Sequence, residues 1–143
     1  MDLQVQVVDN SPEYYEFIRL LRNDPRVAEG FLESASITAQ QQSRYMNRFA
    51  HCYMVALANG RPAGYGGVVD GDLRVCVHPD YQGQGIGGVI VARLLDRFPG
   101  AQVRIKWGNE ASFRLFAKFG YEPYVVLLAR SLGKSGIRDM GTS

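Results

Sequence analysis

A run of glycines, QGQGIGG at residues 82–88, separates a strand-like segment from a strongly amphipathic one. Glycine loses more backbone entropy on folding than other residues, so four glycines within six positions need a reason beyond a tight turn. Apolar residues then recur at 86, 90, 94 and 98, which predicts a helix that begins in the loop. The backbone N–H groups of a glycine loop at the start of a helix form a binding site for phosphate groups.

Dinucleotide binding is the alternative for this loop. Gly83, Gly85 and Gly88 match the pattern G-x-G-x-x-G, which by itself is weak evidence. A Rossmann fingerprint directly follows the first strand, whereas here residues 78–82 intervene and strands joined by hairpins come first. The next predicted strand also ends at Trp107 without the acidic residue that would hold a ribose. The loop therefore favours a pyrophosphate site of a different kind.

The hydropathy pattern predicts a single mixed α/β domain over residues 1–132, with a flexible tail at 133–143. Asn59-Gly60 and Asp70-Gly71 are turn signals for two β-hairpins. Asn109 is placed to cap a helix that Gly120 ends. The predicted strands are 3–8, 52–58, 63–69, 73–78, 101–107 and 124–132. The predicted helices are 14–24, pieces of 26–48 with a break near 36–38, 86–98 and 110–119.

Composition narrows the class of protein. A net charge of +2 over 143 residues is too small to indicate nucleic-acid binding. No apolar stretch reaches about 18 residues, so no membrane span is expected, and the N-terminus does not read as a signal peptide. A cytoplasmic protein is expected, in which Cys52 and Cys76 are free thiols. No metal site is predicted.

The segment VCVHPDYQGQGIGGVIVARLLD resembles the acetyl-CoA motif of the GNAT superfamily of N-acetyltransferases. Gln82, Gly85 and Gly87 match the fixed positions of that motif, and Val-His-Pro at 77–79 matches its strand end. The later segment NEASFRLFAKFGYEP resembles the second motif of the family. Four residues are in register there: Asn109, Phe116, Gly120 and Tyr121. Two motifs at the expected separation are more specific than either alone, and together they cover about residues 72–123.

The resemblance implies a fold and a co-substrate. The fold expected from this resemblance has a central sheet that is mixed and mostly antiparallel, is flanked by helices, and splays where acetyl-CoA inserts. Backbone groups near Cys76 and Val77 would bind the pantetheine arm, and one N–H there would polarise the thioester carbonyl, a contact typically worth about 2.7–4 kcal/mol. The other cofactor-binding candidates are Gln82, Gly83, Gln84, Gly85, Ile86, Gly87, Gly88, Asn109 and Phe116.

Candidates for acid–base chemistry are few. Asp72 lies near the position where the family often carries a base, and it could equally be a hairpin residue. The family often has a tyrosine as general acid where this chain has Phe116, which cannot donate a proton, so Tyr121 becomes the candidate acid. Cys76 could accept an acyl group in a ping-pong scheme, although a buried core thiol is the simpler interpretation. His78 precedes a proline that ends a strand, and a structural role is favoured for it.

The sequence therefore indicates an enzyme that transfers an acetyl group from acetyl-CoA directly to a primary amine. The acceptor could be an amino sugar, free or linked to a nucleotide, and Tyr53 and Tyr65 are candidates to line its pocket. A monomer or a homodimer is expected. The alternative is a catalytically degenerate GNAT domain that binds acyl-CoA as a sensor or partner module, which the phenylalanine at 116 keeps open.

Overall fold

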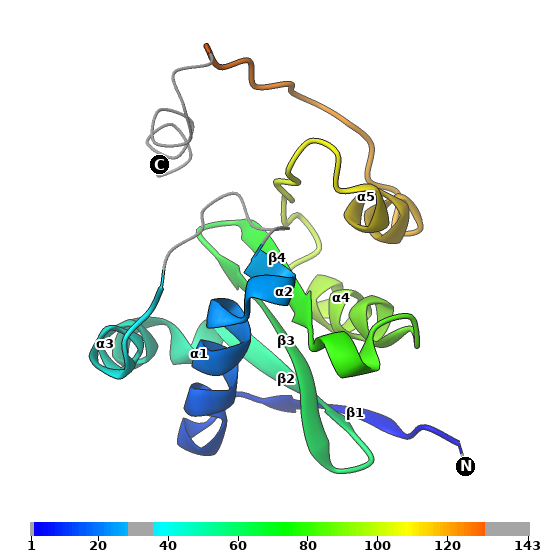
Figure 1. Cartoon of the computed structure of the whole chain (residues 1–143). Coiled ribbons are helices and arrows are strands. Elements are labelled where there is room, and N and C mark those ends of the chain that lie inside the picture. The colour runs from blue at the N-terminus through cyan, green and yellow to red at the C-terminus, as the bar shows by residue number, and fades with distance from the viewer. Residues whose placement is uncertain (1, 29–35, 131–143) are drawn as a thin grey trace.

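A four-stranded antiparallel sheet lies at the centre of the computed structural model, which describes residues 2–28 and 36–130 (Figure 1). The strands follow one another in the order β1-β2-β3-β4, so each pairs with its neighbour in sequence. Their bounds are Val5–Asp9 for β1, Tyr53–Ala58 for β2, Arg61–Val69 for β3 and Asp72–Val77 for β4. Every described pairing in this sheet is antiparallel.

Both predicted hairpin turns are confirmed. Asn59 and Gly60 have φ angles of 50° and 82°, and Asp70 and Gly71 have 52° and 79°. Two consecutive positive φ angles are those of a type I′ turn, whose twist matches that of the strands it joins. The turns fix the register of β2 on β3 and of β3 on β4.

Helices cover both faces of the sheet (Figure 1). On one face pack α1, α2 and α3, and on the other pack α4 and α5. Their bounds are Tyr15–Asn23 for α1, Pro25–Ala28 for α2, Ala39–Phe49 for α3, Ile86–Arg97 for α4 and Glu110–Ala117 for α5. Short 3-10 turns are η1 at Pro12–Tyr14, η2 at Ala50–Cys52 and η3 at Pro79–Tyr81.

The sheet separates two apolar clusters, because successive side chains of a strand point to opposite faces. On β4, Leu73, Val75 and Val77 pack toward the cluster around α4, whereas Cys76 joins the cluster under α1 and α3. Ile90 is among the least exposed residues of α4, as its four-residue periodicity predicts. The predicted amphipathic helix after the glycine loop is therefore confirmed.

Polar caps mark the ends of the predicted helices. The Asn109 side chain accepts a hydrogen bond from the Ser112 N–H at 3.2 Å, and Gly120 has a φ of 85°. Thr38, which belongs to the break predicted near 36–38, forms a full capping box with Gln41 at the start of α3. The Asn109 and Thr38 side chains each satisfy an N–H group that a helix start leaves unpaired, and such a cap is worth about 1 kcal/mol.

Two predicted strands are not present as such. Of the predicted strand at 101–107, only Gln102 pairs, as an isolated parallel bridge to Asp72. Residues 124–130, the described part of the last predicted strand, form no strand, and Tyr124 is 93% exposed. The chain after α5 runs away from the sheet (Figure 1). Because a segment forms a strand only where it pairs with the edge of another strand, this segment forms none.

The predicted tail at 133–143 lies outside the described residues, so the boundary at 132 stays a prediction. None of the helices within the described ranges combines the length and hydropathy that crossing a bilayer requires.

Candidate functional site

The glycine loop follows β4 through η3 and leads directly into α4. Gly83 and Gly85 have φ angles of 79° and 82°, a conformation that side chains other than glycine's rarely adopt. Gly85 is the N-cap of α4. A Cβ added to either glycine would meet nothing within 4 Å. The loop therefore presents bare backbone to open space at the start of a helix.

The backbone N–H groups of this loop are available to a ligand. Within the described part of the chain, none of the N–H groups from Gly83 to Gly88 donates a hydrogen bond, and the first bond of α4 runs from Val89 N–H to Gly85 C=O at 3.2 Å. Free N–H groups at a helix start carry a partial positive charge. Such an arrangement is able to bind phosphate groups.

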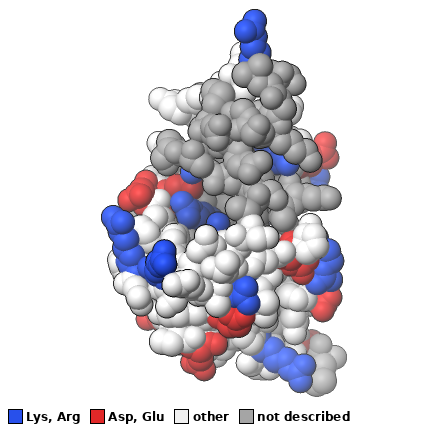
Figure 2. Space-filling view, turned by 60° about the vertical axis from the view of Figure 1, so that its left-hand side comes forward, with Lys and Arg blue, Asp and Glu red and all other residues white. Residues whose placement is uncertain are grey.

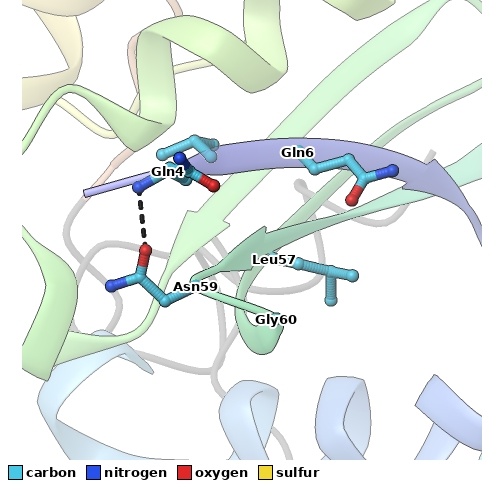
Figure 3. Close-up of a pocket in the computed structure, with 6 residues that line it drawn as sticks. Gln4, Gln6, Leu57, Asn59 and Gly60 are labelled. Carbon is cyan, nitrogen blue, oxygen red and sulfur yellow. Dashed lines mark hydrogen bonds between the residues drawn. The ribbon is translucent and has the colours of Figure 1, made fainter. Parts of the chain in front are cut away.

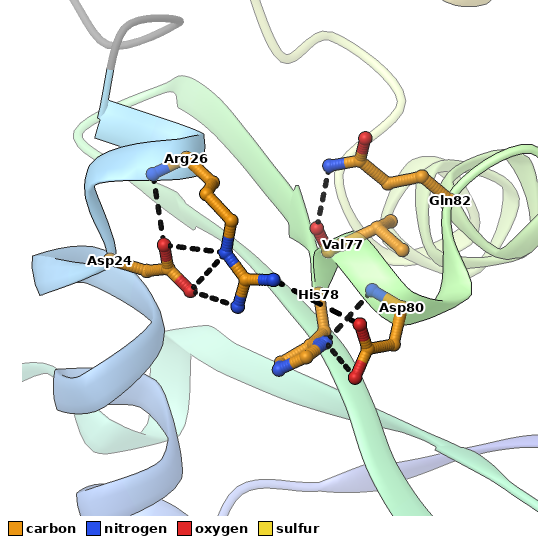
Figure 4. A network of polar contacts seen from close by, with 6 residues as sticks. All are labelled: Asp24, Arg26, Val77, His78, Asp80 and Gln82. Atoms are coloured by element: carbon orange, nitrogen blue, oxygen red, sulfur yellow. Dashed lines mark hydrogen bonds and ion pairs between the residues drawn. The ribbon is translucent and has the colours of Figure 1, made fainter.

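Side-chain contacts hold the loop in place (Figure 4). The Gln82 amide donates to the Val77 carbonyl at 3.1 Å, which ties the loop to the end of β4. The Asp80 N–H donates to Nδ1 of His78 at 3.0 Å. Gln82 and His78 therefore position the loop, and the imidazole has the structural role expected for it.

Arg26 of α2 connects the loop to the opposite face of the sheet (Figure 4). Its guanidinium is 2.7 Å from a carboxylate oxygen of Asp24 and 3.9 Å from one of Asp80. Hydrogen bonds from Arg26 lower the pKa of Asp24 to about 2. Sequence reasoning missed this contact, because residues 26 and 80 approach each other only through the tertiary fold.

The outer edge of β4 is open beyond its first residues. Leu73 N–H donates to Gln102 C=O at 2.8 Å, and Gln102 N–H donates to Gly71 C=O at 2.8 Å. Residues 103–107 then leave the strand. Alternate residues of a strand direct their backbone groups to the same edge, so Val75 and Val77 face the same side as Leu73. The sheet therefore splays at this edge, beside the glycine loop.

The register separates the roles of neighbouring residues. Cys76 pairs with Tyr65 of β3, so its own backbone faces into the sheet and the open edge belongs to Val75 and Val77. Sequence reasoning did not single out Val75, although the two-residue alternation from Val77 contains that signal. Burial raises the pKa of the Cys76 thiol to about 12, which keeps it protonated at neutral pH.

The second motif contributes a cap and a core residue. The Oδ1 atom of Asn109 is engaged by Ser112 N–H. Phe116 is 3% exposed, and its ring packs edge-on against Tyr121 at 5.4 Å. A Cβ on Gly87 would lie 3.4 Å from the Leu115 side chain. Phe116 thus supports the contact of α5 with α4 from within the core.

Both candidate acid–base groups have partners. The carboxylate of Asp72 accepts hydrogen bonds at 3.4 Å from Arg74 and at 3.4 Å from Arg104. The Tyr121 hydroxyl donates to the Ala101 carbonyl at 2.6 Å, and burial raises the pKa of Tyr121. Neither contact could be predicted from spacing, since Arg104 and Ala101 are distant in sequence.

The candidate acceptor tyrosines lie on the face covered by α1 and α3. The hydroxyl of Tyr53 is 2.6 Å from that of Tyr45 and accepts a hydrogen bond from Arg74 at 3.4 Å. Tyr65 is 4% exposed, and burial raises its pKa well above its usual value. Both tyrosines are buried in the same core cluster, and only the Tyr53 hydroxyl is joined to Asp72 through Arg74.

One further hollow is described away from the glycine loop. A hollow of about 430 Å³ lies near the β2–β3 turn, where the Asn59 side chain accepts from Gln4 N–H (Figure 3). Neither β4 nor the glycine loop lines it. Among the described residues no group of three or more His, Cys, Asp or Glu side chains is placed to hold a metal. Acidic and basic side chains are interspersed on the face seen in Figure 2.

Comparison with known proteins supports the same fold. The acetyltransferase (GNAT) family matches residues 14–121. Three solved structures superpose with TM-scores of 0.70 to 0.71, each over 82% of this chain. The first is a putative acetyltransferase, yncA, from Salmonella typhimurium with acetyl-CoA, at 19% identity over 79% of that chain. The second is a ribosomal-protein-alanine N-acetyltransferase from Brucella melitensis, at 20% identity over 84% of that chain. The third is a spermidine N-acetyltransferase from Vibrio cholerae with CoA and spermine, at 15% identity over 80% of that chain.

At these identities the superpositions establish the fold, and the family match covers well over half of the chain. The glycine loop at the start of α4 and the open edge of β4 lie within the matched residues. This protein belongs to the GNAT family of acetyltransferases.

Proposed function

We propose that this protein transfers an acetyl group from acetyl-CoA to a primary amine by direct attack of the amine on the thioester. The observation that carries the proposal is the row of N–H groups from Gly83 to Gly88 at the start of α4, which find no hydrogen-bond partner among the described residues. It is the site that a pyrophosphate needs, and it stands beside the open edge of β4. The acetyl-CoA bound in the superposed Salmonella structure supports this choice of co-substrate.

The chain supplies binding and polarisation to such a reaction. The loop amides would hold the pyrophosphate. The outward backbone groups of Val75 and the N–H of Val77 would pair with the pantetheine arm, since the Val77 carbonyl already accepts from Gln82. An N–H on this edge would donate to the thioester oxygen as negative charge develops there, which favours the transition state. The amine would lose its proton to solvent or to a side chain such as Asp72, and the departing thiolate would be protonated in turn.

A domain that binds acyl-CoA without turning it over is the second candidate. It is favoured because neither position considered for the general acid offers a free proton: Phe116 has none and is buried, and the Tyr121 proton is directed to Ala101. A general acid or base typically contributes about 10²- to 10⁴-fold to a rate. Because a thiolate is a fair leaving group, turnover does not depend on such an acid.

Release of free thiol from acetyl-CoA, corrected for hydrolysis and screened over primary amines, tests the proposal. We expect amine-dependent release by the wild type, and the same release within about threefold by Cys76→Ala, because direct attack needs no acyl-enzyme and this thiol is protonated. Micromolar CoA binding without turnover of any amine would establish the non-catalytic domain. Loss of turnover in a folded Cys76→Ala protein would instead establish a ping-pong route.

Replacing Tyr121 with phenylalanine tests its candidacy as the general acid. We expect a loss of about 1 kcal/mol in the free energy of unfolding, because the hydrogen bond to Ala101 C=O disappears. We expect kcat to change less than threefold, since the hydroxyl already donates elsewhere. Steady-state kinetics and urea denaturation give the two values. A 100-fold fall in kcat with unchanged stability would show that Tyr121 is the acid after all.

A further inference from the structure

Arg74 lies on β4, next to the open edge where the proposed thioester would bind. It precedes Val75, whose backbone faces the open edge of β4. Its own side chain is on the opposite face from Leu73 and Val75, toward α1 and α3. If the proposed function holds, Arg74 is thus the charged residue of β4 nearest to the reacting carbonyl on the acceptor side.

The contacts of this guanidinium leave part of it available. Its Nη1 donates to the hydroxyls of Tyr45 at 3.1 Å and Tyr53 at 3.4 Å, and its Nε donates to Asp72 at 3.4 Å. The Nη2 group has no hydrogen-bond partner within residues 2–28 and 36–130. The side chain is 37% exposed. One arm of the guanidinium is therefore fixed while the other remains open to a ligand.

The tyrosines that fix Arg74 are themselves held by the sheet. Tyr53 is 3% exposed, and its hydroxyl lies 2.6 Å from that of Tyr45 on α3. Gly67 of β3 pairs with both Tyr53 and Arg74. A Cβ on Gly67 would lie 2.6 Å from the Tyr53 ring, so glycine allows that ring to lie across β3 toward the arginine. The cluster is a built arrangement of rigid side chains.

The charges around the cluster favour an anion. Arg104 shares Asp72 with Arg74, so one carboxylate faces two guanidinium groups. Burial raises the pKa of Tyr45, and the nearby charges of Arg74 and Arg22 act in the opposite direction. Among the described residues, the Asp72 carboxylate is thus shared by two guanidinium groups, and a cationic acceptor would meet like charge beside Arg74.

We propose that Arg74, held by Tyr45 and Tyr53, binds an anionic oxygen group of the acceptor, so that the substrate is an amine carrying a carboxylate or a phosphate. A guanidinium presents parallel N–H groups that fit the planar edge of such an anion. Polyamines, which carry only positive charge, fit this cluster poorly. The inference names the acceptor class for the proposed transferase and depends on that function.

Matched acceptors that differ only in the anion test the inference. Thiol release is measured with amino acids against their carboxamides, and with glucosamine 6-phosphate against glucosamine. We expect the wild type to prefer the anionic member of at least one pair by about 10- to 100-fold in kcat/KM. In Arg74→Gln this preference is expected to fall to about one, while the KM for acetyl-CoA stays unchanged. Which pair shows the preference distinguishes carboxylate from phosphate.

Further variants separate binding from folding. Arg74→Lys keeps the positive charge but loses the parallel N–H groups of the guanidinium, so it should retain part of the preference for anionic acceptors. Arg97→Gln removes a distant charge on α4 and should retain that preference in full. Thermal unfolding of all three verifies the fold. Turnover of neutral amines with no preference for anions, or a preference that survives Arg74→Gln, would overturn this inference and leave the proposed function standing. No turnover of any amine would overturn the proposed function itself, and calorimetry of the anionic probes with CoA-loaded protein would then decide the anion site.

Discussion

Replacing Gly85 with aspartate is expected to weaken CoA binding about 100-fold more than replacing it with asparagine. Gly85 has a φ of 82°, a conformation that asparagine and aspartate tolerate better than other side chains. The two substitutions have nearly the same shape, and a Cβ at this position meets nothing within 4 Å. They differ by one negative charge beside the proposed pyrophosphate, and at 4 Å such repulsion is about 4 kcal/mol at an effective dielectric constant of about 20.

The helix itself gives the control for this experiment. Gly85 is the N-cap of α4, where aspartate and asparagine are both favoured and where a negative charge stabilises the helix dipole. Gly85→Asp should therefore unfold at the same temperature as Gly85→Asn or slightly higher, although it binds CoA far more weakly. Calorimetric Kd values for CoA and thermal melts check both statements. Equal Kd values for the two variants would show that the CoA phosphates do not bind at this loop.

Local sequence signals were sufficient for the elements that hold the loop. A type I′ turn needs only Asn-Gly or Asp-Gly between two strand patterns, and both such turns were found as predicted. The start of α4 followed from glycines and a four-residue repeat, and the cap at Asn109 from its position before the apolar run. Each of these features depends on residues within a few positions of one another.

The errors concern contacts between distant segments. The apolar alternation in 101–107 and the apolar residues from Tyr124 onward look like strands, but whether they pair depends on which edge of the sheet is open to them. Gln102 pairs with the first residues of β4, and the chain after residue 102 then leaves the outer edge of that strand. The partners of Asp72 show the same limit: Arg74 lies two positions away on the same strand, whereas Arg104 could be found only from the fold.

Gly66→Ala is expected to lower the free energy of unfolding by about 2–3 kcal/mol, the largest stability effect among the predictions made for this chain. An added Cβ would lie 2.5 Å from Ile90 Cγ2, 2.9 Å from Leu94 Cδ1 and 2.9 Å from the Arg74 carbonyl oxygen. Ile90 and Leu94 are fully buried on α4, and β4 supplies the third contact, so the helix must move off the sheet.

A shift of α4 would also move the N–H groups at its start, which links this core glycine to the cofactor site. We therefore expect Gly66→Ala to bind CoA at least tenfold more weakly even where it remains folded. Gly100→Ala is the matched control, because a Cβ there meets nothing within 4 Å, and it should stay within about 0.5 kcal/mol of the wild type. Urea denaturation followed by circular dichroism measures both. Wild-type stability of Gly66→Ala would contradict the close seating of α4 on β3 that positions the loop.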